Sequence, residues 1–179
     1  MPHEAPKISV ITLGCSKNIV DSEQLLGQLT MGHATVVDDV EDAEIAVINT
    51  CGFIDAAKQE SIDAIIEAVE RKKNGKLKKV VVMGCLSERY AKELRKEIPQ
   101  VDTYFGSQQL QDVVMELGVD YKKELLGERA LSTPRHFAYL KISEGCDRPC
   151  SFCAIPLMRG KHVTKPMEQV VRETEMLAA

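Results

Sequence analysis

The chain has 179 residues, a formal net charge of −4 and 44% hydrophobic residues. This length and composition suffice for the core of one ordinary domain, or of one domain and part of another. The acidic balance does not support direct nucleic-acid binding, and the absence of tryptophan argues against a surface on which bases stack.

Short hydrophobic segments and turn residues alternate along the first two thirds of the chain. β-Branched runs predict strands at residues 8–13, 35–37, 44–49, 79–83 and 101–105. Helices are expected at residues 18–31, 54–73 and 108–117, and a further one is expected to begin at an N-cap, Ser87, and to end before Pro99. This alternation is typical of a parallel sheet flanked by helices, and it predicts an α/β fold.

A polar stretch at residues 119–135 interrupts this pattern and is interpreted as a linker. It divides the chain into a first domain, residues 1–118, and the start of a second domain, residues 136–179. In the second part we expect a strand at residues 137–142, a loop, and a helix at residues 167–177. The chain is therefore interpreted as a fragment of a larger enzyme that cannot complete a reaction alone.

No hydrophobic run reaches the roughly 18 residues of a membrane span, and the run at residues 8–13 is shorter than the hydrophobic region of a secretory signal. We therefore expect a cytoplasmic protein that has no membrane partner. The six cysteines could form disulfides, but disulfide frameworks are typical of small secreted proteins rich in loops. The sequence favours reduced thiols that bind a metal or take part in chemistry.

Three of the cysteines follow three of the predicted strands. Cys15, Cys51 and Cys85 each lie one or two residues beyond a hydrophobic run. Because parallel strands end at one edge of a sheet, where ligands bind, these distant thiols are able to converge. The alternative is that they are three buried structural cysteines, which are common in protein cores. Their shared position after a strand favours a common site.

The other three cysteines, Cys146, Cys150 and Cys153, lie within eight residues of one another. A structural zinc site would need a fourth ligand, and His162 is interpreted as a surface histidine instead. Iron–sulfur clusters are normally held by four thiolates, so that three would leave one iron open, as at a catalytic site. The same reasoning applies to the first three cysteines, and two clusters are the prediction.

The spacing Cys-x3-Cys-x2-Cys, with Phe152 before the last cysteine, resembles the signature of radical S-adenosylmethionine (SAM) enzymes. Five segments are similar to those of the radical SAM methylthiotransferase family: Leu13-Gly-Cys-Ser-Lys-Asn-Ile-Val-Asp-Ser-Glu23, Asn49-Thr-Cys-Gly-Phe-Ile54, Gly84-Cys-Leu-Ser-Glu-Arg-Tyr90, Tyr139-Leu-Lys-Ile-Ser-Glu-Gly-Cys146 and Cys153-Ala-Ile-Pro-x-x-Arg-Gly160. Lys17 and Asn18 resemble the branch that modifies a ribosomal protein (RimO type), although Ser16 stands where that branch usually has proline.

This resemblance implies an N-terminal methylthiotransferase domain followed by the first strand–loop–helix unit of a radical SAM (β/α) barrel. It also implies two 4Fe–4S clusters, one on Cys15, Cys51 and Cys85 and one on Cys146, Cys150 and Cys153. SAM would bind the open iron of the second cluster, with Phe152 near its adenine, and would yield a 5′-deoxyadenosyl radical.

The radical would take a hydrogen from the β-carbon of an aspartate in a small-subunit ribosomal protein, and the first cluster would supply the sulfur of the methylthio group. An electron donor such as flavodoxin or ferredoxin is implied as a partner. Two other functions stay open: the same chemistry on a tRNA adenosine (MiaB type), and a non-catalytic metal-binding module. Asp21, Glu23 and Glu144 could orient a ligand, or they could be solvated or cap helices.

Overall fold

A computed structural model describes residues 6–122 and 129–178 of the chain. Part of the predicted linker, residues 123–128, therefore lies outside the described residues. Within the described residues, no helix combines the length and the apolar character that a membrane crossing requires.

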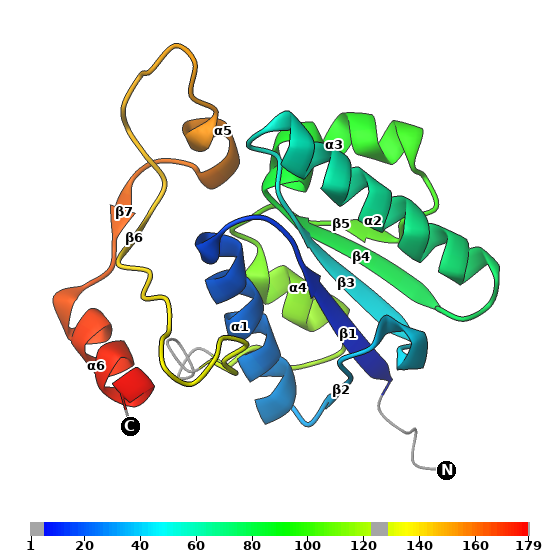
Figure 1. Ribbon diagram of the computed structural model, residues 1–179, viewed down its shortest axis with the longest axis horizontal. Coiled ribbons are helices and arrows are strands. Elements are labelled where there is room, and N and C mark those ends of the chain that lie inside the picture. Colours follow the sequence, from blue (N-terminus) through cyan, green and yellow to red (C-terminus); the bar gives the residue numbers. More distant parts are fainter. Residues whose placement is uncertain (1–5, 123–128, 179) are drawn as a thin grey trace.

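One parallel sheet forms the centre of the molecule (Figure 1). Its strands are β1 (Lys7–Thr12), β2 (Thr35–Val36), β3 (Ile45–Thr50), β4 (Lys79–Gly84) and β5 (Thr103–Tyr104), in the order β2-β1-β3-β4-β5. Every residue of the central strand β3 is buried, as expected for a strand that is covered on both faces.

Helices cover both faces of this sheet. Helices α1 (Ser16–Met31) and α4 (Leu110–Glu116) lie on one face, and α2 (Asp55–Lys73) and α3 (Cys85–Glu97) lie on the other (Figure 1). A short 3₁₀ turn, η1 (Val40–Asp42), precedes β3. Leu25 of α1 packs in one hydrophobic core with Val47 of β3, while Ile65 of α2 packs in the other with Val82 of β4. The predicted α/β fold with a parallel sheet is confirmed.

The prediction that Ser87 caps α3 is wrong. The helix begins at Cys85, directly after β4, and the hydroxyl of Ser87 donates instead to the carbonyl oxygens of Gly84, at 3.1 Å, and of Phe105. Gly84 has a φ of 104°, and a Cβ there would lie 2.5 Å from Oδ1 of Asn49. Glycine is therefore needed for the strand to turn into the helix without a loop, which fixes Cys85 at the edge of the sheet.

The remaining described residues form a smaller unit beside α1 (Figure 1). It contains β6 (Ser143–Glu144) and β7 (Val163–Thr164), which pair in antiparallel fashion, and the helices α5 (Ile155–Arg159) and α6 (Met167–Ala178). The strand predicted at residues 137–142 is wrong, because the first strand after residue 136 in the described part of the chain is β6, which begins at Ser143; of the predicted segment, Ile142 alone continues the pairing, through its carbonyl, which accepts from the amide of Lys165 at 2.9 Å. The helix predicted at residues 167–177 is confirmed.

Replacing Leu25 by alanine should lower the free energy of unfolding by about 2–5 kcal/mol, because its fully buried side chain would leave a cavity against the sheet. Met31 ends the same helix with 45% of its side chain exposed, so Met31→Ala should change the free energy by less than about 0.5 kcal/mol. Urea unfolding followed by circular dichroism measures both values. Equal losses in the two variants would contradict this packing.

Candidate metal centre

Cys15, Cys51 and Cys85 lie at the carboxyl ends of three neighbouring strands, β1, β3 and β4. Sheets of this strand order bind ligands outside the carboxyl ends of the strands, at the switch point between β1 and β3. Cys15 precedes α1 directly, Cys51 lies in the short connection to α2, and Cys85 is the first residue of α3. The thiols of Cys15 and Cys85 therefore lie at helix N-termini, where the helix dipole favours negative charge.

The three cysteines line a single cavity of about 760 Å³. This volume falls within the range of about 300–1,000 Å³ that is usual for ligand pockets. The wall around the thiols is mostly apolar and comes from the start of α2 and from α5: Phe53, Ile54, Ala56, Ala57, Ile155 and Met158. The prediction that these distant cysteines share one site is therefore supported by their positions around a common space.

Gly14 permits the chain after β1 to approach the side chain of Cys51 closely. It has a φ of 94°, and a Cβ at this position would lie 2.8 Å from the sulfur of Cys51. A side chain at residue 14 would therefore displace Cys51 from the cavity. Ser61 of α2 holds Cys51 from the other side, since its hydroxyl accepts from the Cys51 amide at 2.9 Å and donates to the Cys51 carbonyl at 3.0 Å.

Asn18 joins the ends of the three strands. Its side-chain amide donates to the carbonyl oxygen of Leu13, after β1, at 2.7 Å and to that of Thr50, the last residue of β3, at 3.0 Å. Its Oδ1 lies 3.9 Å from the sulfur of Cys85, which follows β4. Asn18 is fully buried. One amide group thus sets the relative positions of the segments that carry the cysteines.

Burial raises the pKa of Cys85 to about 11, although the charge and hydrogen bond of Arg159 act to lower it. Negative charge on Cys51 and Cys15 would raise the pKa of Cys85 further, because both residues lie within electrostatic reach of its sulfur. Without a positive ligand, the Cys85 thiol therefore resists ionisation. A bound metal centre would supply the missing positive charge.

The donor side chains of the described residues are too far apart to bind a single metal ion. Among residues 6–122 and 129–178, no three His, Cys, Asp or Glu side chains are grouped closely enough for one ion. An iron–sulfur cluster has a different requirement, because each thiolate binds a different iron and the sulfurs lie farther apart than around one ion. Three cysteines spread around a wide cavity fit this requirement, whereas a single zinc ion would need its ligands grouped more closely.

The second set of cysteines lies on the loop between β6 and α5. The amide of Cys146 donates to the carbonyl of Gly160 at 3.1 Å and closes the base of this loop, and the amide of Cys153 donates to the carbonyl of Cys150 at 3.2 Å. Cys150 is exposed, whereas Cys146 and Cys153 are half-buried. The loop therefore presents its thiols near the surface.

Phe152 is 93% exposed on this loop. Its contact with the adenine of SAM stays a prediction. His162 is also exposed, and its ring nitrogen lies 3.0 Å from the hydroxyl of Thr164.

A buried group of charges links the two parts of the chain. Arg159 donates to Asp21 at 2.5 Å and to Glu144 at 3.3 Å. Lys141 pairs with the same two acids. Asp21 and Glu144 are therefore neither solvated nor helix caps. Burial opposes the ionisation of Glu144, but the hydrogen bond and charge of Lys141, with the charges of Arg159 and Lys17, outweigh it and lower its pKa to about 2.

Glu23 is also held in an interior position. It is fully buried, and its Oε1 accepts from the amide of Ser132 at 2.9 Å and from the hydroxyl of that residue at 3.0 Å. Arg129 lies 3.4 Å from its other oxygen. These contacts assign Glu23 to the junction between the two parts of the chain.

Sequence patterns assigned no role to Arg159 or Lys141. Their partners are more than a hundred positions away in the chain, except for the neighbouring Glu144, so no local pattern indicates the contacts. The one signal that could have found Arg159 is its place in the segment of residues 153–160 that resembles the family.

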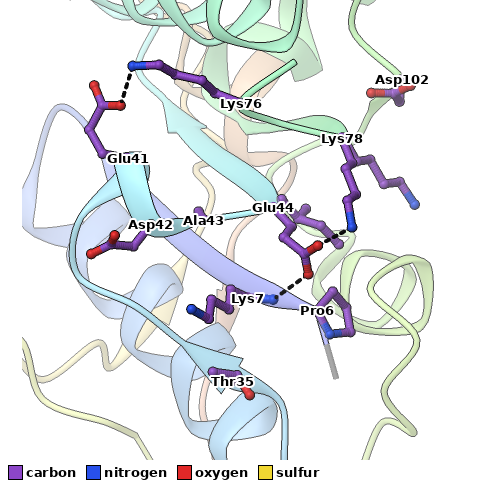
Figure 2. A pocket seen from close by; sticks show the side chains of 12 residues that line it. Pro6, Lys7, Thr35, Glu41, Asp42, Ala43, Glu44, Lys76, Lys78 and Asp102 are labelled. Carbon is purple, nitrogen blue, oxygen red and sulfur yellow. Dashed lines mark hydrogen bonds and ion pairs between the residues drawn. The ribbon is translucent and has the colours of Figure 1, made fainter. Parts of the chain in front are cut away.

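Figure 2 shows a second cavity, of about 1,010 Å³, at the opposite edge of the sheet. Four of its charged side chains form two ion pairs: Lys76 with Glu41 at 2.9 Å, and Lys78 with Glu44, which also accepts from the amide of Lys7 at 3.3 Å. None of the six cysteines is among the described residues that line it. The cysteine cavity is therefore the candidate site.

Comparison with known proteins gives one family match and several close relatives. A family model described as "Uncharacterized protein family UPF0004" matches residues 7–106. The "Ribosomal protein uS12 methylthiotransferase RimO" of Flavobacterium psychrophilum is 60% identical over 96% of this chain and 40% of that protein. Proteins of the same name from Christiangramia forsetii and Chloroherpeton thalassium are 59% and 55% identical, over 97% and 99% of this chain and 38% and 41% of theirs. The chain thus spans about 40% of the length of these relatives.

A solved structure also matches. It is described as the "Structure of Cobalamin-dependent S-adenosylmethionine radical enzyme OxsB with aqua-cobalamin and S-adenosylmethionine bound", and it covers 97% of this chain and 32% of that one, with a TM-score of 0.56 and 14% identity. At this identity the similarity shows the fold alone. The relatives carry the name that the motifs predicted, so the resemblance to RimO-type methylthiotransferases is confirmed. Because the family model spans more than half of the chain, the chain belongs to the family UPF0004.

Proposed function

We propose that the chain is the N-terminal part of a radical SAM methylthiotransferase that adds a methylthio group to the β-carbon of an aspartate in ribosomal protein uS12. The observation that carries the proposal is the meeting of Cys15, Cys51 and Cys85 around one cavity at the edge of the sheet. The names of the relatives supply the substrate, and a ribosomal substrate in turn implies a cytoplasmic enzyme.

In this proposal Cys15, Cys51 and Cys85 hold the first 4Fe–4S cluster. Three thiolates leave one iron without a protein ligand, and no fourth cysteine is found among the described residues that line the cavity. The side chains of Phe53 and Ile54 contribute an apolar wall to the cavity, although each is more than half exposed. Asn18 keeps the three strand ends in register, so that the thiols stay in place when the cavity is filled.

Cys146, Cys150 and Cys153 hold the second 4Fe–4S cluster, where SAM binds, with Phe152 near the SAM adenine. When bound, this cluster and SAM supply one-electron chemistry, which is needed because the β-carbon of an aspartate is too weakly acidic for a general base. Flavodoxin or ferredoxin is the proposed electron donor. The two cysteine sets belong to different proposed domains, residues 1–118 and 136–179, joined by the linker of residues 119–135.

Anaerobic reconstitution should load about eight irons and eight labile sulfides per chain, as expected for two 4Fe–4S clusters. Replacing Cys15, Cys51 and Cys85 by serine should lower both counts to about four. Replacing Cys146, Cys150 and Cys153 should do the same, so each triple variant is the control for the other. Zinc at one ion per chain, with no labile sulfide, would support a non-catalytic module and contradict the proposal.

Asn18→Asp should weaken iron binding by Cys15, Cys51 and Cys85 by about 10- to 100-fold. The variant replaces the side-chain NH₂ group of Asn18, which donates to the carbonyl oxygens of Leu13 and Thr50, by a carboxylate oxygen that cannot donate. Iron titration in a chain that lacks the second set of cysteines measures this effect. Asn74→Asp makes the same chemical change at an exposed helix end and should bind iron like the parent chain. Equal iron binding by the two variants would show that Asn18 does not organise the site.

The substrate is tested with an enzyme of the relatives' full length that carries this sequence. Incubation with SAM and a reductant should convert one aspartate of uS12 to its methylthio form, which mass spectrometry detects. The Cys51→Ser variant of the same enzyme should give no methylthio product, because the first cluster would lack one of its three ligands. Methylthio-adenosine in tRNA, with unmodified uS12, would instead assign the chain to the tRNA-modifying branch.

A further inference from the structure

Arg159 is a buried arginine that connects the two cysteine sets. It is the last residue of α5 and follows Cys153 closely in the chain, yet its side chain lines the cavity of Cys15, Cys51 and Cys85. Only 2% of Arg159 is exposed. A guanidinium group is retained in such a position only when several partners compensate for its lost hydration.

The guanidinium group is held on the side of the cavity where Cys85 lies. Its Nη1 donates to Asp21, and its Nη2 donates to Oδ1 of Asn18. The same Asn18 oxygen lies 3.9 Å from the sulfur of Cys85. Arg159 and Cys85 therefore converge on one atom of Asn18, and the helix of Arg159 packs against α3, the helix that Cys85 begins (Figure 1).

The backbone of α5 is fixed to the first domain as well. The carbonyl oxygens of Met158 and Arg159 accept hydrogen bonds from the side chains of Ser107 and Gln108, each at 2.6 Å. Because the amide of Cys146 bonds to the carbonyl of Gly160, the loop that carries the second cysteine set is closed next to this anchor. The position of α5 thus determines where the loop lies relative to the first cavity.

Arg159 belongs to a group of paired charges. Asp21 and Glu144 face Arg159 and Lys141, and Lys17 pairs with Glu144 at 3.3 Å. The buried Arg159 and Lys141 balance Asp21 and Glu144, and Lys17, whose side chain is 43% exposed, adds a further positive charge that solvent screens in part. Glu60 also lines the cavity, but it is exposed to solvent, which screens its charge. A cavity with three thiolates gathers negative charge, and the buried guanidinium lies where it offsets that charge.

We propose that Arg159 is a positioning residue that fixes the loop of Cys146, Cys150 and Cys153 against the first cysteine cavity and keeps a permanent positive charge beside Cys85. The electrostatic half of this inference rests on the proposed function, because it requires a cluster on the first cysteine set. The positional half does not, because it concerns the fold of the chain without metal.

Lysine cannot replace arginine in this position. The planar guanidinium reaches Asp21 and Asn18 with two different nitrogens, whereas the single ammonium group of lysine is not able to span both in the same geometry. Arg159→Lys therefore keeps the charge and loses part of the positioning. Arg159→Gln loses both, while Asp21 and Glu144 keep Lys141 as a partner.

Hydrogen–deuterium exchange of the metal-free chain tests the positional half. Amides of residues 146–160 should exchange about tenfold faster or more in Arg159→Gln, with an intermediate effect in Arg159→Lys, because the buried ion pair that holds α5 is lost. Arg172→Ala removes an exposed arginine of α6 and should leave these rates unchanged. Unchanged rates in both Arg159 variants would overturn the positional half.

The electrostatic half is tested on the reconstituted chain in which Cys146, Cys150 and Cys153 are alanine, so that iron can enter only the first site. The midpoint potential of this cluster should be lower in Arg159→Gln than in the parent chain, because a positive charge and a hydrogen bond near a ligand sulfur are lost. Arg159→Lys should recover part of the shift. If Arg159→Gln does not fold, as judged by circular dichroism, Arg159→Lys carries both tests.

The possible failures are distinguishable. Equal potentials in the parent and in the Arg159 variants would overturn the electrostatic role of Arg159. A parent chain that takes up no iron would contradict the proposed function, while the exchange rates of the metal-free chain would still decide whether Arg159 positions the loop.

Discussion

All strands of a parallel sheet end at the same edge, and this constraint determines the rest of the site. In the ladder between β3 and β4, Thr50 pairs with Gly84, so the next residues, Cys51 and Cys85, lie beyond the same level of the sheet. Cys15 follows β1, the neighbour of β3 on the other side. Cysteines far apart in sequence thus meet without any long loop, and the short connections to the helices leave little freedom for them to move away.

Residues of the second part of the chain line the cysteine cavity at this edge of the sheet. Ile155, Met158 and Arg159 supply one wall of the cysteine cavity, and the buried pairs of Arg159 connect that wall to α1. The ion pairs at the opposite edge, such as that of Lys76 with Glu41, are exposed, and pairs of that kind contribute only about 0–1 kcal/mol. Removing one partner of a buried pair costs about 3–5 kcal/mol, so the buried group around Arg159 matters more for the arrangement of the site.

Sequence patterns predicted the parallel sheet, because β-branched runs and glycines alternate with helical segments at regular spacing. The same patterns located Cys15, Cys51 and Cys85 at the strand ends. They failed where the outcome depends on distant partners. Residues 137–142 have the composition of a strand, but the strand with a pairing partner begins only at Ser143, and Ile142 alone extends that pairing. Ser87 bonds to Phe105 instead of capping a helix. Arg159 went unrecognised because burial and its bonds to Asn18 and Asp21 arise only after folding.

The central claim is that Cys15, Cys51 and Cys85 together bind one iron–sulfur cluster at the edge of the sheet. Crystals of the anaerobically reconstituted chain, measured at the iron absorption edge, would locate the iron atoms directly by anomalous scattering. The account predicts an anomalous peak inside the cavity, in contact with all three sulfurs. The account would be contradicted if iron were bound only by Cys146, Cys150 and Cys153, and if the sulfurs of the other three cysteines pointed into separate parts of the core.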